Sequence, residues 1–159
     1  MKLEIKKLKD SKQYFNDVFE CLYEHWGNNN PEYWKSVILY SMGDKEIPCT
    51  YVVLNESIFV GTFSIWSCDL MSRQDLYPWL AGIVVKKEFR KLGVGTYIQF
   101  QAVSILKNLG IKKAYLFTII NGFYEKTGWT YISDVYDEND IKCRLYEIEL
   151  GEFNEKRNF

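Results

Sequence analysis

Two glycines beside a basic stretch are the residues in this sequence whose types and spacing best predict chemistry. Residues 83–96 read IVVKKEFRKLGVGT, with Gly93 and Gly95 at the start of a helical pattern and four basic residues within positions 86–91. Glycine lets the backbone approach a ligand closely because it has no Cβ. The first N–H groups of a helix lack partners and carry partial positive charge. We therefore predict an anion site here, with a pyrophosphate as its natural ligand.

Two common pyrophosphate sites do not fit this spacing. A dinucleotide-binding fold needs glycines directly after the strand and a third glycine where this sequence has Ile98. A nucleotide P-loop needs Gly-Lys-Ser/Thr, which is absent. A glycine-rich helix start that binds nothing is the remaining alternative, and the adjacent basic run makes it less favoured.

A second informative segment is Asn121–Trp129, which reads NGFYEKTGW. It places Tyr124 in a short helix directly after a strand. We expect Phe123 and Trp129 to be core aromatics.

Together the two segments resemble the GNAT N-acetyltransferase family. Arg90–Gly95 matches its R/Q-x-x-G-x-G/A signature, and Phe123–Trp129 looks like its F-Y-x-x-x-G-F/W element. The two motifs occur in the family's order, about 30 residues apart, with a helix and a strand between them. Each motif alone is weak evidence, whereas the ordered pair is specific.

The resemblance implies an enzyme that binds acetyl-CoA, needs no metal and transfers the acetyl group directly to an amine of a small molecule or peptide. The cofactor would lie where two neighbouring strands, ending near Val85 and Thr118, splay apart. Tyr124 would protonate the departing thiolate, and backbone N–H groups near Gly82 and Ile83 would stabilise the oxyanion. The residues implied to contact the cofactor are Ile83, Val84, Val85, Arg90, Lys91, Leu92, Gly93, Val94, Gly95, Thr96 and Asn121.

The sequence departs from the family pattern at two of these positions. Asn121 touches the tyrosine element directly, so its loop is shorter than in many members. Lys91 occupies a position that often holds glycine, but it keeps a backbone N–H.

The acceptor side is less defined. The resemblance implies that the first helices and the loop before the central strand line it, with Trp26, Asp69, Asp75, Tyr77 and Trp79 as candidate contacts. Aromatic rings and acids suit a cationic amine, although packing in the core is the alternative for each ring. The candidates for the general base are Asp69, Asp75, Glu20, Glu24 and His25, and a water chain is an equal alternative.

Two other functions fit the same residues. A GNAT-like module could bind and sense acyl-CoA without turnover. An unrelated pyrophosphate-binding protein would bind NAD or ATP instead.

The elements that must position these residues form a mixed α/β pattern. We expect a single GNAT-like domain over residues 1–150, with a central, mostly antiparallel sheet of about seven strands and about four flanking helices, and a polar tail over 151–159. The predicted strands are 3–8, 47–54, 57–66, 78–85, 113–118, 129–135 and 142–150. The predicted helices run to Trp26 from a cap at Asp10 or Ser11, and over 31–42, 94–109 and 122–127.

Composition sets the outer limits. The chain has 159 residues, which suits one domain. Its 20 basic and 21 acidic residues give a net charge of −1, so general binding to nucleic acid or an anionic membrane is not expected. There is no signal-type or membrane-spanning run, and the four cysteines have no metal or redox spacing. We expect a cytoplasmic protein with reduced thiols, as a monomer or homodimer.

Overall fold

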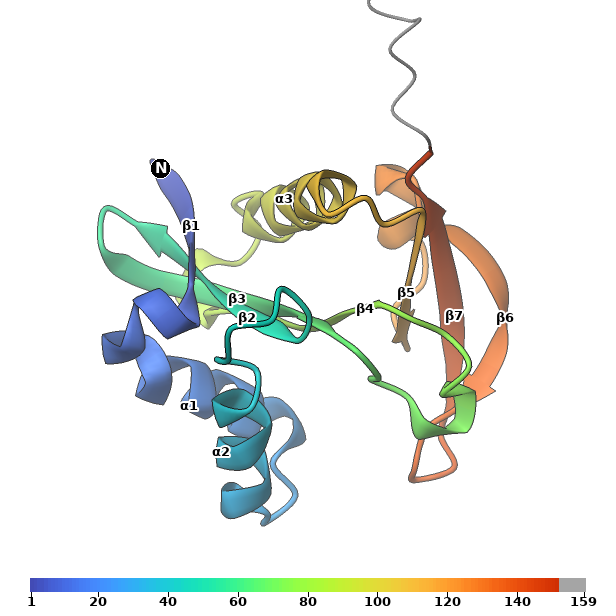
Figure 1. Ribbon diagram of the computed structural model, residues 1–159, viewed down its shortest axis with the longest axis horizontal. Coiled ribbons are helices and arrows are strands. Elements are labelled where there is room, and N and C mark those ends of the chain that lie inside the picture. Colours follow the sequence, from blue (N-terminus) through green and yellow to red (C-terminus); the bar gives the residue numbers. More distant parts are fainter. Residues whose placement is uncertain (152–159) are drawn as a thin grey trace, which may run out of the picture. The chain divides into compact units, whose positions relative to one another are not determined.

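The computed structural model describes residues 1–151, which divide into two compact units (Figure 1). The first unit contains residues 1–67 and 80–98, and the second contains residues 68–79 and the chain from 99 on. The predicted tail lies, apart from Gly151, outside the described residues. The domain boundary at residue 150 stays a prediction.

The strands of the first unit are β1 (Leu3–Lys7), β2 (Cys49–Asn55), β3 (Ile58–Trp66) and all but the first residue of β4 (Trp79–Val85). β1 pairs with β2, and β2 with β3, in antiparallel register. Glu56 and Ser57 form the turn between β2 and β3, with φ of +49° and +73°. Two left-handed residues are typical of the type I′ turn, which suits the twist of a hairpin. The strands predicted over 47–54 and 57–66 therefore form a hairpin.

Two helices cover one face of β2 and β3 in this unit, α1 (Phe15–Trp26) and α2 (Pro31–Leu39) (Figure 1). Because apolar residues recur on one side of each helix, they pack into a shared core with the strands. Its fully buried members are Leu8, Val18, Leu22, Ile38 and Val52.

The predicted helix starts and ends need two corrections. α1 begins at Phe15, after the 3-10 turns η1 (Leu8–Asp10) and η2 (Lys12–Tyr14), so neither Asp10 nor Ser11 caps it. Ser11 instead joins the two turns: its N–H donates to Leu8 and its carbonyl accepts from Tyr14. α2 ends at Leu39 rather than near 42, and the Ser41 hydroxyl is bonded to the Ile38 carbonyl at 2.6 Å.

The second unit is built on β5 (Lys113–Thr118), β6 (Thr130–Tyr136) and β7 (Lys142–Glu149). β7 pairs antiparallel with both β5 and β6. The core of this unit includes Leu70, Val135, Cys143 and Leu145 packed around Trp79. Trp79 also pairs in parallel with Tyr115.

The strand order is β1-β2-β3-β4-β5-β7-β6, a seven-stranded, mostly antiparallel sheet, as predicted. The predicted splay of β4 and β5 stays a prediction. α3 (Val94–Asn108) runs from the first unit into the second, and the positive φ of Gly110 follows its end.

The fourth predicted helix, over 122–127, is the 3-10 helix η5 (Tyr124–Thr127), which begins two residues later. Gly128, with φ of +98°, ends it after one turn, which is too short for α-helical bonding. Two further 3-10 turns are η3 (Met71–Arg73) and η4 (Lys87–Phe89).

Candidate active site

The loop before α3 presents unpaired backbone N–H groups. Its backbone is left-handed at Lys91 and Gly93, with φ of +62° and +85°. Val94 is buried and anchors the first turn of α3, whereas Lys91 and Gly93 are exposed. The first N–H groups of α3 have no partner within the helix until Tyr97, which donates to the Gly93 carbonyl at 3.0 Å. We call residues 90–96 the phosphate loop, because this geometry suits an anion.

β4 leads into the phosphate loop and has an irregular backbone. Gly82 has φ of +57°, a left-handed residue in the middle of a strand. Such a residue marks a bulge, where backbone groups turn away from the regular ladder. β3 also approaches closely, because a Cβ on Gly61 would lie 2.7 Å from the Val84 carbonyl oxygen. The glycine at position 61 is thus explained by packing.

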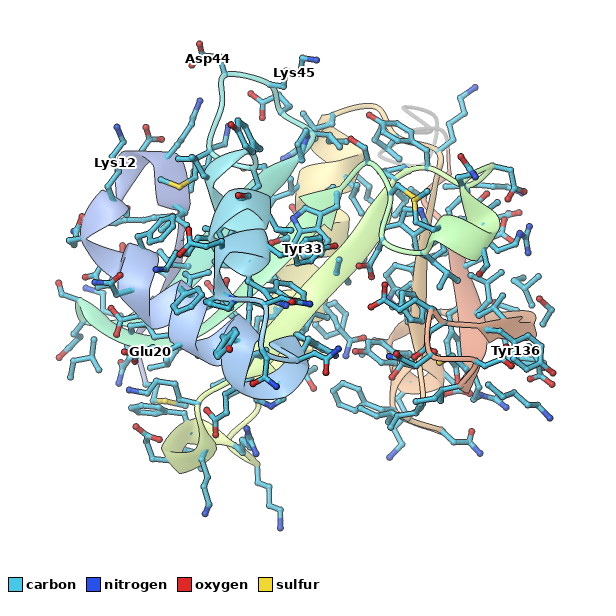
Figure 2. All side chains as sticks on the ribbon, turned by 90° about the horizontal axis from the view of Figure 1, so that it is seen from below. Lys12, Glu20, Tyr33, Asp44, Lys45 and Tyr136 are labelled. Atoms are coloured by element: carbon cyan, nitrogen blue, oxygen red, sulfur yellow. The ribbon has the colours of Figure 1, made fainter. Side chains whose placement is uncertain are left out.

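A cavity of about 320 Å³ lies in the first unit between α1 and the end of β4. It brings predicted cofactor residues together with predicted base candidates: its lining includes Val84, Val85 and Arg90, and Glu20, Glu24 and His25 from α1. Figure 2 shows Glu20 on this helix. Cys21 also lines the cavity, and burial raises the pKa of its thiol to about 11, so the thiol stays neutral.

Tyr124 is held in the second unit by η5. Its side chain is 7% exposed, and burial, followed by the charge of Tyr146, raises its pKa to about 12. The Tyr124 carbonyl accepts from Trp129 N–H at 3.2 Å and from the Thr127 hydroxyl at 3.1 Å. The Thr127 hydroxyl also contacts the side-chain amide of Gln99 on α3. Asn121 is exposed between β5 and η5.

The predicted acceptor residues differ widely in environment. Trp26 is 46% exposed and stacks on Trp34 of α2, with ring centroids 6.3 Å apart. Tyr77 is 52% exposed. Trp79 is fully buried, and its Nε1 donates to the Leu76 carbonyl at 2.8 Å. The Trp79 ring thus lies in the core of the second unit, and its contact with substrate stays a prediction.

Asp69 and Asp75, the two acids of the loop after β3, lie in different environments. Asp75 is exposed and forms two 3.0 Å hydrogen bonds with Arg73, which hold its pKa below the usual range. Asp69 is half-buried, and desolvation raises its pKa to about 7. A carboxyl group that titrates near neutrality suits a general base better than one held by an arginine.

Sequence reasoning missed a polar network beside Tyr124. Tyr146 on β7 is fully buried, and its hydroxyl contacts both Glu125 and Arg144. The Arg144 guanidinium also lies 4.0 Å from the centre of the Tyr131 ring. The alternation of β7 places Tyr146 on the same face as Arg144, but its partner Glu125 lies 21 residues away in sequence.

Three other features can be stated of residues 1–151. The four cysteines are free, and three of them are buried. No group of three or more His, Cys, Asp or Glu side chains in this part could hold a metal ion. None of its helices is long and apolar enough to cross a membrane.

The model of the acetyltransferase (GNAT) family matches residues 12–129. The chain therefore belongs to the acetyltransferase (GNAT) family, which confirms the predicted family and enzyme class. No curated protein sequence matches the chain significantly.

Solved structures of GNAT enzymes share the fold. A crystal structure of aminoglycoside 6'-N-acetyltransferase complexed with coenzyme A has 13% identity and a TM-score of 0.75, covering 94% of this chain and 98% of that chain. A chimera of the spermidine N-acetyltransferase SpeG from Vibrio cholerae and hSSAT has 14% identity and a TM-score of 0.73, covering 94% and 96%. A GNAT family acetyltransferase from Elizabethkingia anophelis with acetyl-CoA bound has 14% identity and a TM-score of 0.64, covering 92% and 97%.

Proposed function

We propose that this protein is an acetyl-CoA-dependent N-acetyltransferase that acetylates a primary amine of a small molecule or peptide. The observation that carries the proposal is the phosphate loop, a left-handed, exposed backbone segment at the start of α3 that follows a basic connector. Its family membership makes the pyrophosphate of CoA the expected anion. The N–H of Arg90 already donates to the Lys87 carbonyl at 3.3 Å, so the N–H groups of residues 91–96 are the proposed phosphate donors.

The proposed chemistry needs no acyl-enzyme. The neutral amine attacks the thioester carbonyl, the C–S bond breaks, and sulfur leaves as a thiolate. The left-handed backbone at Gly82 turns nearby N–H groups away from the strand ladder, which supports a role for them in stabilising the oxyanion. Backbone groups of residues 83–85 would pair with the pantetheine as an added strand.

Tyr124 is the proposed group at the leaving sulfur. Its pKa of about 12 lies above that of a free thiol, near 8.5, so the phenol holds its proton more tightly than the sulfur would. Tyr124 therefore acts by donating a hydrogen bond to the developing thiolate. The proton that finally neutralises the sulfur comes from the attacking amine.

The acceptor is proposed to be cationic. The cavity between α1 and the end of β4 is lined by the carboxylates of Asp17, Glu20 and Glu24. Trp26 and Tyr33 expose their rings near the junction of α1 and α2. Such rings and acids attract an ammonium group. The structural neighbours include enzymes named for aminoglycosides and spermidine, which are polycationic amines.

A ligand panel followed by an amine screen tests the proposal. Acetyl-CoA and CoA should raise the melting temperature, because a ligand that binds only the folded state stabilises it, and NAD and ATP should not. Release of CoA thiol should then be measured with spermidine, an aminoglycoside, lysine and a peptide N-terminus. Stabilisation by CoA without transfer to any amine would indicate an acyl-CoA sensing module, and stabilisation by NAD or ATP alone an unrelated pyrophosphate binder.

A further inference from the structure

His25 ends α1 with a defined arrangement of its ring nitrogens. Its Nδ1 lies 3.0 Å from the Cys21 carbonyl oxygen. A carbonyl only accepts hydrogen bonds, so Nδ1 carries the hydrogen, and a neutral imidazole then has its lone pair on Nε2. That Nε2 lies 3.5 Å from Nη2 of Arg90, which is a donor. The neutral ring can therefore donate a hydrogen bond to the Cys21 carbonyl and accept one from Arg90.

Arg90 connects His25 to the end of β4. Its Nε donates to the Val85 carbonyl at 2.9 Å. The guanidinium thus closes the connector 86–89, which contains η4, and joins α1 to the last residue of β4. Arg90 is also the first residue of the phosphate loop and directly precedes the left-handed Lys91. Its side chain is exposed and bonds to groups of the protein itself, next to the left-handed residue of the loop.

We propose that His25 is a positioning residue of the cofactor site: the neutral imidazole keeps the Arg90 guanidinium on the Val85 carbonyl, and this contact holds the phosphate loop ready for a pyrophosphate. The inference rests on the proposed function, because it takes the pyrophosphate of CoA as the ligand of the loop. It assigns His25 no proton transfer with the substrate, because both ring nitrogens face groups of the protein.

The cavity around this contact carries further charges. They are Asp17, Glu20 and Glu24 on α1, and Lys86, Lys87 and Glu88 on the connector. Lys86 is paired with Glu88 at 3.3 Å. Without an acceptor at position 25, Arg90 would turn from the Val85 carbonyl toward the α1 carboxylates, and the phosphate loop would loosen.

Calorimetric titration of CoA into the full chain tests the inference. His25→Phe keeps a ring but no acceptor, so its affinity for CoA should be roughly three- to tenfold weaker than that of the wild type. His25→Gln offers an amide oxygen at a similar reach and so restores the acceptor. Its affinity should stay within about twofold of that of the wild type.

The controls separate this inference from the proposed function. Lys12→Gln changes an exposed charge outside the cavity, labelled in Figure 2, and should bind CoA as the wild type does. Melting curves without ligand show whether each variant folds. If the wild type does not bind CoA, the proposed function fails. If the wild type binds CoA and His25→Phe binds it equally, or if His25→Gln loses as much affinity as His25→Phe, the role of His25 is overturned.

Discussion

The hydroxyl of Tyr146 donates a hydrogen bond of 2.6 Å to the carboxylate of Glu125, which directly follows Tyr124 in the chain. Arg144 Nε donates to the same hydroxyl at 2.8 Å, and the rings of Tyr146 and Tyr124 lie 5.9 Å apart. Tyr146 on β7 is fully buried, and its hydroxyl makes two hydrogen bonds, so its ring gives Tyr124 a fixed neighbour. Because η5 has only one turn, this support replaces the rigidity that a longer helix would provide.

Removing the Tyr146 hydroxyl should therefore weaken both the fold and the site. Tyr146→Phe leaves Arg144 and Glu125 without their shared partner, and we expect the free energy of unfolding in urea to fall by about 1–2 kcal/mol. The kcat should fall several-fold because Tyr124 is less well held. Tyr131→Phe is a matched control, since it loses an exposed hydroxyl bonded to Asp134, and should cost under ~0.5 kcal/mol. Equal losses in both variants would contradict a special role for Tyr146.

Tyr124→Phe should lower kcat roughly 100-fold and leave the Kd for CoA unchanged, because the hydroxyl acts only on the developing thiolate. Steady-state kinetics and calorimetry measure the two quantities. Since burial raises the Tyr124 pKa to about 12, the group keeps its proton throughout the range of assay, and the wild-type kcat should show no loss from its ionisation up to about pH 10. A variant with wild-type kcat would remove Tyr124 from the mechanism.

The left-handed backbone of the phosphate loop predicts opposite effects at two positions. Lys91→Gly relieves an unfavourable φ of +62° and should raise the free energy of unfolding by about 0.5 kcal/mol, after the entropy cost of glycine. Gly93→Ala should lower it by about 1 kcal/mol, although a Cβ there would meet nothing within 4 Å, so the cost comes from the backbone alone. Denaturant unfolding measures both changes, and changes of the same sign would be inconsistent with this backbone geometry.

Asp69→Asn should stabilise the protein at alkaline pH. Desolvation raises the folded-state pKa of Asp69 to about 7, above its unfolded value near 3.9, so the folded state binds the proton more tightly. The wild type therefore loses stability as the pH rises from about 4 to about 7, and the variant does not. We expect a gain of about 1–2 kcal/mol at pH 8 and little at pH 4.5, measured by urea unfolding, with allowance for partial solvent exposure.

Asp75→Asn is the control for that measurement, because its effect on stability at pH 8 should have the opposite sign. The pair with Arg73 lowers the pKa of Asp75, so its contribution is present above the unfolded pKa and is lost as the pH falls through the folded one. Asp75→Asn should lower stability at pH 8. A gain of stability for Asp69→Asn that is the same at both pH values would contradict the raised pKa.

Local sequence was sufficient for the features set by near neighbours. The hairpin of β2 and β3, the end of α3 before Gly110 and the seven strands followed from hydrophobic period and turn residues. The pair of motifs around Gly93 and Tyr124 was enough to indicate the family, which the match over residues 12–129 confirms.

Contacts between distant segments could not be predicted in this way. The resemblance implied Trp79 as a substrate contact, with core packing as the alternative, and only the folded chain shows that Val135 and Leu145 pack around it. The chemical environments of Asp69 and Asp75, six residues apart, depend on burial for one and on Arg73 for the other.

The sequence by itself determined the order of elements, the family and the position of the proposed phosphate loop, because these depend on backbone preferences within a few residues. The tertiary structure decided which side chains support that segment. It placed His25 of α1 beside Arg90, and Tyr146 of β7 beside Glu125, across 65 and 21 residues of chain. Such partners depend on how helices and strands pack, and no local pattern records a hydrogen bond between segments that meet only in the folded chain.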